Sequence, residues 1–114
     1  MRSRKSKRVE IIDETFIDAP PGLVASVVRD RRNQRNWWPH VVLTLVADRG
    51  DEGLLWRVSG QLEGEFEVWL EPCWEGTLLH HYVRATAPAG VRRDVGSAHV
   101  ARWKAAVTSL KDAL

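Results

Sequence analysis

Residues 62–84, LEGEFEVWLEPCWEGTLLHHYVR, contain two strand-like segments on either side of a tight turn. From Leu62 to Leu70 every second residue is apolar or Gly, and glutamates fill the alternate positions except at Trp69. This period of two is typical of an antiparallel strand with one buried face. Residues 72–76 contain Pro and Gly, and residues 77–84 are rich in β-branched and aromatic side chains. The stretch therefore predicts a β-hairpin.

The C-terminal segment has the spacing of an amphipathic helix. Its apolar face recurs every three or four residues and consists of Val95, His99, Trp103, Val107, Leu110 and Leu114. Because such a face must pack on another element, we expect this helix to cover the sheet. Asp94 or Ser97 is expected to cap its start. A sheet closed by one last helix implies a cavity between the two.

The first half of the chain supplies the remaining elements. Residues 9–17 alternate like a strand, and Pro20-Pro21 suits the first turn of a helix. A second short helix is expected at about 32–37, and strands at 40–47 and 54–59. Gly60-Gln61 is compatible with a two-residue turn or with a bulge in one long bent strand. The fold class is thus α+β with five to six antiparallel strands.

Length and charge define one domain with a basic extension. The chain has 114 residues with a net charge of +2, and five of its 17 basic residues lie among the first eight positions. We expect residues 1–8 to form a flexible basic tail and residues 9–114 to form a single domain. Nucleic-acid binding through this tail is unlikely because no aromatic residues are interleaved with its charges. No apolar run is long enough for a membrane span or a signal peptide, which predicts a cytoplasmic protein.

The sequence offers little for cofactor or metal chemistry. Cys73 is the only cysteine, which excludes an internal disulfide and a cysteine-based zinc site. The four histidines lack the spacing of a ready-made metal site, and no carboxylate cluster accompanies them. There is also no Gly-rich phosphate loop, dinucleotide fingerprint or nucleophile elbow. We therefore expect no cofactor and no metal.

The elements occur in a recognisable order. A strand is followed by two short helices, a Trp38-Pro39 junction, a meander containing Trp69-Leu70-Glu71-Pro72 and Glu75-Gly76-Thr77, and a long helix. This order resembles the SRPBCC, or START-like, superfamily, specifically its bacterial polyketide cyclase/dehydrase and lipid-transport group. The resemblance covers about residues 9–114 and implies a helix-grip fold, in which a curved sheet packs on the C-terminal helix. Members commonly have six or seven strands, so this chain resembles a shortened member.

The resemblance implies a hydrophobic pocket between the sheet and the last helix. Alternation along the strands and the helical spacing predict which side chains face it. The expected ligand-binding residues are Trp38, His40, Trp56, Val58, Phe66, Val68, Tyr82, His99, Trp103 and Val107. For the tryptophans, packing in the core is the competing interpretation, and the small number of strands favours it.

Histidine is the natural acid or base if the pocket is catalytic, because its ordinary pKa lies near neutrality. The candidates are His99 together with Tyr82 or His80 across the pocket, although a satisfied core histidine is the simpler interpretation of His99. His80 and His81 must point to opposite faces of the sheet, so at most one of them lines the pocket. The glutamates at 63, 65 and 67 share one strand face and are interpreted as solvated surface.

Three classes of function follow, in order of preference. The first is binding of a small hydrophobic ligand, lipid or polyketide-like, which requires only an apolar cavity with few polar groups. The second is a polyketide cyclase or dehydratase that uses a pocket histidine. The third is a protein-interaction module with a filled core, in which Trp69 and Trp74 form a partner or homodimer surface.

Overall fold

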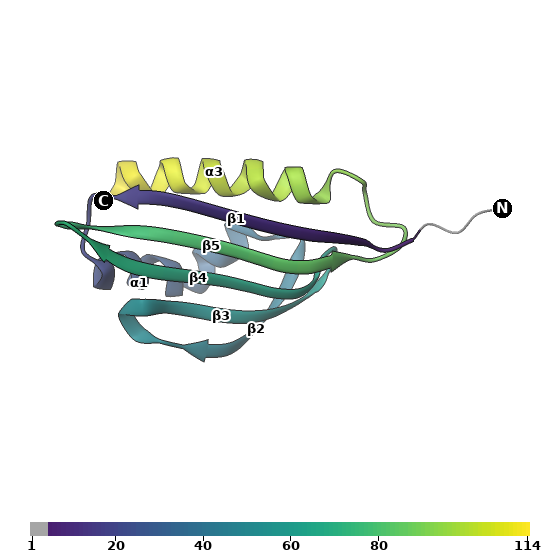
Figure 1. Ribbon diagram of the computed structural model, residues 1–114, viewed down its shortest axis with the longest axis horizontal. Helices are drawn as coiled ribbons and strands as arrows, with labels where there is room; N and C mark the ends of the chain where they lie inside the picture. The colour runs from purple at the N-terminus through teal and green to yellow at the C-terminus, as the bar shows by residue number, and fades with distance from the viewer. Residues whose placement is uncertain (1–4) are drawn as a thin grey trace.

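The computed structural model describes residues 5–114 and contains a five-stranded antiparallel sheet and three α-helices (Figure 1). In chain order the elements are β1 (Lys7–Ile17), α1 (Pro21–Arg29), α2 (Arg31–Trp37), β2 (Val41–Asp48), a 3-10 turn η1 (Gly50–Glu52), β3 (Gly53–Gly60), β4 (Glu63–Cys73), β5 (Gly76–Ala87) and α3 (Val95–Ala113). This order and the α+β class confirm the fold predicted from the sequence.

The sheet has the order β1-β5-β4-β3-β2, so the first strand lies at one edge beside the last strand. The predicted hairpin is the β4–β5 pair, in which Phe66 is opposite Val83 and Cys73 is opposite Gly76. Between β3 and β4 the last paired residues are Val58 and Gly64. The two residues Gln61 and Leu62 connect the strands, one position later than the Gly60-Gln61 turn expected from the sequence, and Gly60 has a positive φ of 110° at the end of β3.

One face of the sheet carries the core, and the long helix α3 packs on it. In Figure 1 α3 runs alongside β1, with its first turn near the beginning of that strand and its end near the strand's end. The inner face carries Leu54, Trp56, Val58, Phe66, Val68, Leu79 and Val83, all at most 3% exposed. The helix adds Val95, His99, Trp103, Ala106, Val107 and Leu110. These positions follow the two periodicities recognised in the sequence, because a strand alternates and a helix repeats every 3.6 residues.

The opposite, outer face of the sheet is polar and partly ion-paired. Glu67 accepts hydrogen bonds from Arg49 at 2.8 Å and Arg84 at 2.9 Å, and Arg84 also lies 3.3 Å from Glu65. Trp69 and Trp74 are exposed on this side of the hairpin, Trp74 to 94%. The glutamates thus form the solvent-facing side of the sheet, as their alternation predicted.

Helix starts follow local chemistry. Pro21 opens α1, where its missing N–H costs no hydrogen bond. Asp30 caps α2 by accepting a hydrogen bond from the Arg32 backbone N–H at 2.9 Å. At α3 the residue before the helix is Asp94, as expected, but its carboxylate bonds to Arg92 instead of a backbone N–H.

The first strand begins earlier than its alternation predicted. The strand β1 begins at Lys7, so the last part of the predicted basic tail belongs to the sheet, while residues 1–4 lie outside the described residues. Within residues 5–114 no helix has both the length and the apolar character needed to cross a bilayer. The expected cytoplasmic location stays a prediction.

Candidate functional site

The middle of the layer between the sheet and α3 is filled by aromatic rings. Trp38 lies at its centre, with ring centroids 5.2 Å from Trp56, 5.4 Å from Phe66 and 5.8 Å from Trp103. All four side chains are at most 2% exposed. Val58, Val68 and Val107 are buried in the same core. Most of the side chains predicted to bind a ligand therefore come together, but they pack against one another.

Three histidines form a hydrogen-bonded chain through this core. His40 Nε2 lies 2.9 Å from His99 Nδ1, and His99 Nε2 lies 2.9 Å from His81 Nε2. At the inner end His81 Nδ1 lies 3.0 Å from the backbone carbonyl of Glu67. The three residues come from the loop before β2, from α3 and from β5, so the chain joins three elements that are distant in sequence.

When the three histidine rings are neutral, the Glu67 carbonyl determines which nitrogen donates and which accepts in each of their hydrogen bonds. A carbonyl oxygen only accepts, so His81 Nδ1 carries the hydrogen and His81 Nε2 is a bare acceptor. His99 must then donate from Nε2 and accept at Nδ1, and His40 must donate from Nε2. The chain ends at His40 Nδ1, a buried nitrogen that has no hydrogen-bond partner within residues 5–114.

Burial keeps these rings uncharged at neutral pH. Desolvation lowers the pKa of His81 to about 4. It also lowers the pKa of His99 to about 2, helped by the nearby His81, His40 and Arg102. The pKa of His40 is lowered by burial and by the positive charge of Arg102.

Asp13 is a site residue that the sequence reading did not identify. It lies opposite His81 in the β1–β5 pairing, and its carboxylate accepts a hydrogen bond from Trp103 Nε1 at 3.0 Å. Lys104 Nζ lies 3.6 Å from the same carboxylate. The sequence does carry a signal for it: Asp13 is a charged residue on the same strand face as Ile11 and Thr15, which is the inner face. The indole N–H of Trp38, in contrast, is buried without a partner in the described part of the chain.

His80 and Tyr82 lie on the outer face of the sheet, away from His99. His80 is next to Glu14 and Glu71, at 3.3 Å and 3.1 Å, and stacks on Trp69 with ring centroids 4.4 Å apart. Tyr82 follows two residues later on the same face, and its side chain is half exposed. The pairing of His99 with either residue across a pocket is therefore not formed, because a strand turns odd and even residues to opposite sides. His81 is the histidine that meets His99.

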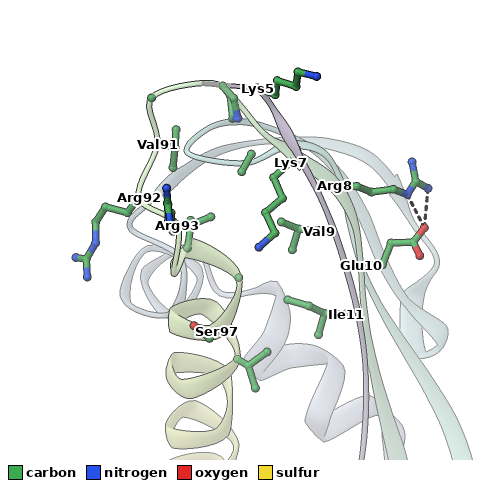
Figure 2. A pocket seen from close by; sticks show the side chains of 16 residues that line it. Lys5, Lys7, Arg8, Val9, Glu10, Ile11, Val91, Arg92, Arg93 and Ser97 are labelled. Carbon is green, nitrogen blue, oxygen red and sulfur yellow. Dashed lines mark hydrogen bonds and ion pairs between the residues drawn. The ribbon is translucent and has the colours of Figure 1, made fainter. Parts of the chain in front are cut away.

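A cavity lies at the open end of the layer, between the start of β1 and the first turns of α3. It has a volume of about 1200 Å³. Figure 2 shows Val9 and Ile11 on one wall and the loop with Val91, Arg92 and Arg93 on the other. Ala87, Val95, Gly96 and Val100 complete its apolar lining. These are small or β-branched residues, so they leave space that the tryptophans fill elsewhere.

The rim of this cavity is basic. Of its charged side chains, Arg8 pairs with Glu10 and Arg92 pairs with Asp94. Lys5, Lys7 and Arg93 have no carboxylate within ion-pair distance among residues 5–114. In Figure 2 the Lys7 ammonium points between the Arg93 segment and Val9. The cavity therefore combines an apolar lining with uncompensated positive charge.

Nothing in the described part of the chain is arranged as a metal centre. No group of three or more His, Cys, Asp or Glu side chains in residues 5–114 has the geometry to hold an ion. Cys73 is a free, half-buried thiol in the β4–β5 turn region.

Comparisons with known proteins support the fold. The Mll3558 protein from Rhizobium loti aligns with a TM-score of 0.73 and 14% identity, covering 96% of this chain and 99% of that one. The Aha1 dimer from Colwellia psychrerythraea aligns with a TM-score of 0.65 and 18% identity, covering 93% and 96%. The DR_A0006 protein from Deinococcus radiodurans gives 0.62 and 16%, covering 93% and 99%. No family model and no curated protein matches the sequence.

These likenesses define a class by fold alone. The three solved structures align with this chain over nearly its whole length, and the sheet packed on a long C-terminal helix gives this protein a helix-grip-like fold. At 14–18% identity the likeness does not extend to ligand or activity.

Proposed function

We propose that this protein binds a small hydrophobic ligand with an acidic head group in the cavity between β1 and α3. The observation that carries the proposal is the combination of an apolar lining at Val9, Ile11 and Val100 with unpaired Lys7 and Arg93 at the rim. An apolar cavity with a few oriented polar groups is the usual form of a ligand site. A lipid or polyketide-like acid has both the chain and the charge that this surface complements.

The position of the cavity differs from the position expected from the sequence. The ten residues predicted to contact a ligand centre on Trp103, whereas the cavity lies nearer the start of α3, from Val95, about two turns before Trp103, to Val100, less than one turn before it. The helix-grip-like architecture supports the proposal because it leaves space between sheet and helix wherever side chains are small. The proposed ligand therefore lies between the sheet and α3, as expected from the sequence, but at the open end of this layer.

Dodecanoate and dodecan-1-ol test the proposal by isothermal titration calorimetry, because they share a chain and differ in charge. We expect dodecanoate to bind more tightly than the alcohol. The double variant Lys7→Ala/Arg93→Ala should weaken dodecanoate binding by at least about tenfold, a loss of about 1.4 kcal/mol. Affinity for the alcohol should change little.

Arg57→Ala is the matched control, since Arg57 is an exposed arginine on β3 outside this cavity. Its affinity for dodecanoate should equal that of the unmodified protein. Equal dodecanoate affinity in all three proteins, or no binding at all, would refute a carboxylate site at Lys7 and Arg93.

Self-association is a second proposal, carried by the exposed hairpin end. Trp74 is 94% exposed, has a positive φ of 54°, and its ring lies edge-on to Phe16 at 6.3 Å. Such exposed aromatic pairs are enriched at interfaces. We expect a dimer in sedimentation velocity that Trp74→Ala converts to monomer, whereas Trp69→Ala has a smaller effect because Trp69 is partly covered by His80. A monomer at all concentrations refutes this proposal.

A further inference from the structure

One end of the molecule concentrates basic side chains. They come from the start of β1, with Lys5, Lys7 and Arg8, and from the loop between β5 and α3, with Arg92 and Arg93. Figure 1 shows both segments at the same end of the long axis, where the first strand begins and the last helix starts. The cavity between β1 and α3 opens between these two segments. This group of five side chains is called the basic end below.

The charges at the basic end do not cancel. The carboxylates of Glu10 and Asp94 each pair with one of its arginines, and the other three cations have no ion-pair partner in the described part of the chain. Glu63 also lies toward this end, because it is opposite Thr86 near the end of β5. Five basic side chains against three acidic ones leave a net positive charge.

The opposite end of the molecule has the opposite sign. The β4–β5 turn lies between Glu71 and Glu75, and Asp18 follows directly after β1. No Lys or Arg occurs in residues 9–28 or 70–79, and at the end of α3 the charges of Lys111 and Asp112 offset each other. The protein is therefore polarised along its long axis. In the field of a negatively charged surface it turns the basic end toward that surface.

The loop at the basic end has an apolar tip of defined shape. Residues 88–91 are Pro-Ala-Gly-Val, and the Val91 N–H donates to the Pro88 carbonyl at 3.2 Å. Gly90 has a φ of 91°, as the third residue of a type II turn requires. Ala89 and Gly90 are exposed, and two arginines follow directly after this turn. A small apolar tip with cations beside it fits the boundary between lipid head groups and acyl chains.

We propose that the basic end docks on the surface of a bilayer that contains anionic lipids. Each Lys or Arg near such a surface strengthens binding by about fivefold, so a cluster of this size gives reversible attachment. The turn at residues 88–91 lies at the level of the head groups, and the acidic hairpin end points to solvent. The mouth of the cavity then faces the membrane.

Nucleic acid is the competing polyanion, and two observations favour the bilayer. Proteins that bind single strands stack the bases on exposed aromatic rings. The large aromatic side chains that are exposed in residues 5–114 are Phe16, Trp69 and Trp74, which lie in the half of the sheet nearer the β4–β5 turn. The neutral turn at residues 88–91 also has no charge with which a phosphate could pair, whereas it suits an apolar boundary.

Docking is separable from the proposed carboxylate site. In Figure 2 the Arg92 side chain extends away from the cavity and Lys5 lies at its outer end, while the Lys7 ammonium points inward. Lys5 and Arg92 can therefore be replaced while Lys7 and Arg93, which are assigned to the ligand's head group, stay in place. Either proposal can fail without the other.

Co-sedimentation of the full chain with vesicles tests the docking. The vesicles are pure phosphatidylcholine and a two-to-one mixture of phosphatidylcholine and phosphatidylserine. We expect binding to the mixed vesicles, weaker binding to the neutral ones, and a loss of affinity as salt is added. Lys5→Gln/Arg92→Gln should weaken binding to the mixed vesicles by at least about tenfold.

Arg57→Gln/Lys111→Gln is the matched control. It also replaces one exposed lysine and one exposed arginine, so the net charge of the chain falls by the same amount, but both positions lie outside the basic end. Its vesicle affinity should stay within about twofold of the unmodified protein. Dodecanoate titrated into both double variants shows whether the cavity still binds its ligand when docking is lost.

A fluorescent label that responds to polarity tests the orientation. It is attached through Ala89→Cys or, as the control at the opposite end, through Glu75→Cys, each in a Cys73→Ser background because Cys73 is the only native cysteine. With mixed vesicles the emission should shift to the blue for the label at position 89 and stay unchanged at position 75.

Four results would overturn the proposal: no binding to mixed vesicles, equal affinity for neutral ones, an equal loss in the two double variants, or equal emission shifts at the two labels. An oligonucleotide that binds as tightly as the mixed vesicles at the same salt concentration, and competes with them, would assign the basic end to nucleic acid instead. None of these results depends on whether dodecanoate binds.

Discussion

The layer between the sheet and α3 is solid around Trp103 and open around Val100, three residues earlier on the same helix. Both regions have the same backbone arrangement of strand and helix. The solid region is filled by indole, phenyl and imidazole rings, whereas valine, alanine and glycine residues line the apolar part of the open one. The comparison shows that side-chain volume, and not the fold, decides where this architecture holds a cavity.

Removal of the central ring should have the largest effect on the solid region. Trp38→Ala deletes a side chain that is 1% exposed and packs against Trp56, Phe66 and Trp103 among other rings. We expect the free energy of unfolding to fall by about 3 to 5 kcal/mol in urea denaturation.

Trp74→Ala provides the matched control, because it deletes the same side chain at a position that is 94% exposed. Measured at a protein concentration where both proteins are monomers, its unfolding free energy should stay within about 0.5 kcal/mol of the unmodified protein. If Trp38→Ala costs as little as Trp74→Ala, the middle of the layer is not packed core and the contrast between the two regions is lost.

Most of this contrast follows from short-range patterns in the sequence. The hairpin from Leu62 to Arg84 and the stripe on α3 are local periodicities, so they predict the strands, the helix and their buried faces. The register of β1 against β5 and the loop at Gly60 depend on long-range packing and turn geometry, which periodicity does not define. The first strand begins at Lys7, two residues before the start at Val9 expected from its alternation, because Lys7 and Arg8 pair with β5.

The site was harder to predict because it depends on which side chains meet. His81 alternates with Leu79 and Val83, both apolar, and this local signal already places it inward. Its contact with His99 and His40 joins three distant segments, and no spacing in the sequence encodes that. The basic rim was missed for a related reason: Lys7 and Arg93 are far apart in sequence and have no apolar periodicity.

Acidification should weaken the solid region next most strongly. Since His81 has a folded-state pKa of about 4 and an ordinary value of about 6.5, the unfolded chain binds its proton first as the pH falls. Stability is complete above pH 6.5 and is lost as the pH falls toward 4. Each such histidine contributes about 1.4 kcal/mol per pH unit in this window, or about 2 kcal/mol between pH 6.5 and pH 5.

Urea denaturation at several pH values measures this slope. The double variant His81→Leu/His99→Leu should reduce it, because two of the three histidines with a lowered pKa are gone and only His40 remains. Asp48, whose pKa is lowered to about 2 by Arg29, titrates below this window and does not contribute to it. An unfolding free energy that is constant from pH 7 to pH 5 would show that the folded chain takes up protons as readily as the unfolded one.

Asp13 links the solid region to the edge strand through a single hydrogen bond. Asp13→Ala leaves the buried N–H of Trp103 without its acceptor, which should cost about 1 to 3 kcal/mol. Asp13→Asn keeps an oxygen that accepts this bond and should restore most of the loss. If alanine and asparagine destabilise equally, the charge of Asp13 beside Lys104 matters more than its bond to the indole.

The smallest effects come from adding volume at each region in turn. Val107→Phe and Val100→Phe are the same substitution seven residues apart, and therefore on the same face of α3. Val107 is 6% exposed in the packed core, so the larger ring should cost about 1 to 3 kcal/mol. Val100 is half-buried at the cavity, so its ring should enter free space with a change below about 0.5 kcal/mol.

The two variants should also separate stability from binding. Val100→Phe fills the apolar part of the cavity and should weaken dodecanoate binding by about tenfold or more, whereas Val107→Phe should leave the affinity of the folded protein unchanged. Calorimetry on both proteins at a temperature where each is folded measures this. If the costs in stability are equal, the cavity at Val100 is closed in solution; if the affinities are equal, dodecanoate occupies a different part of the molecule.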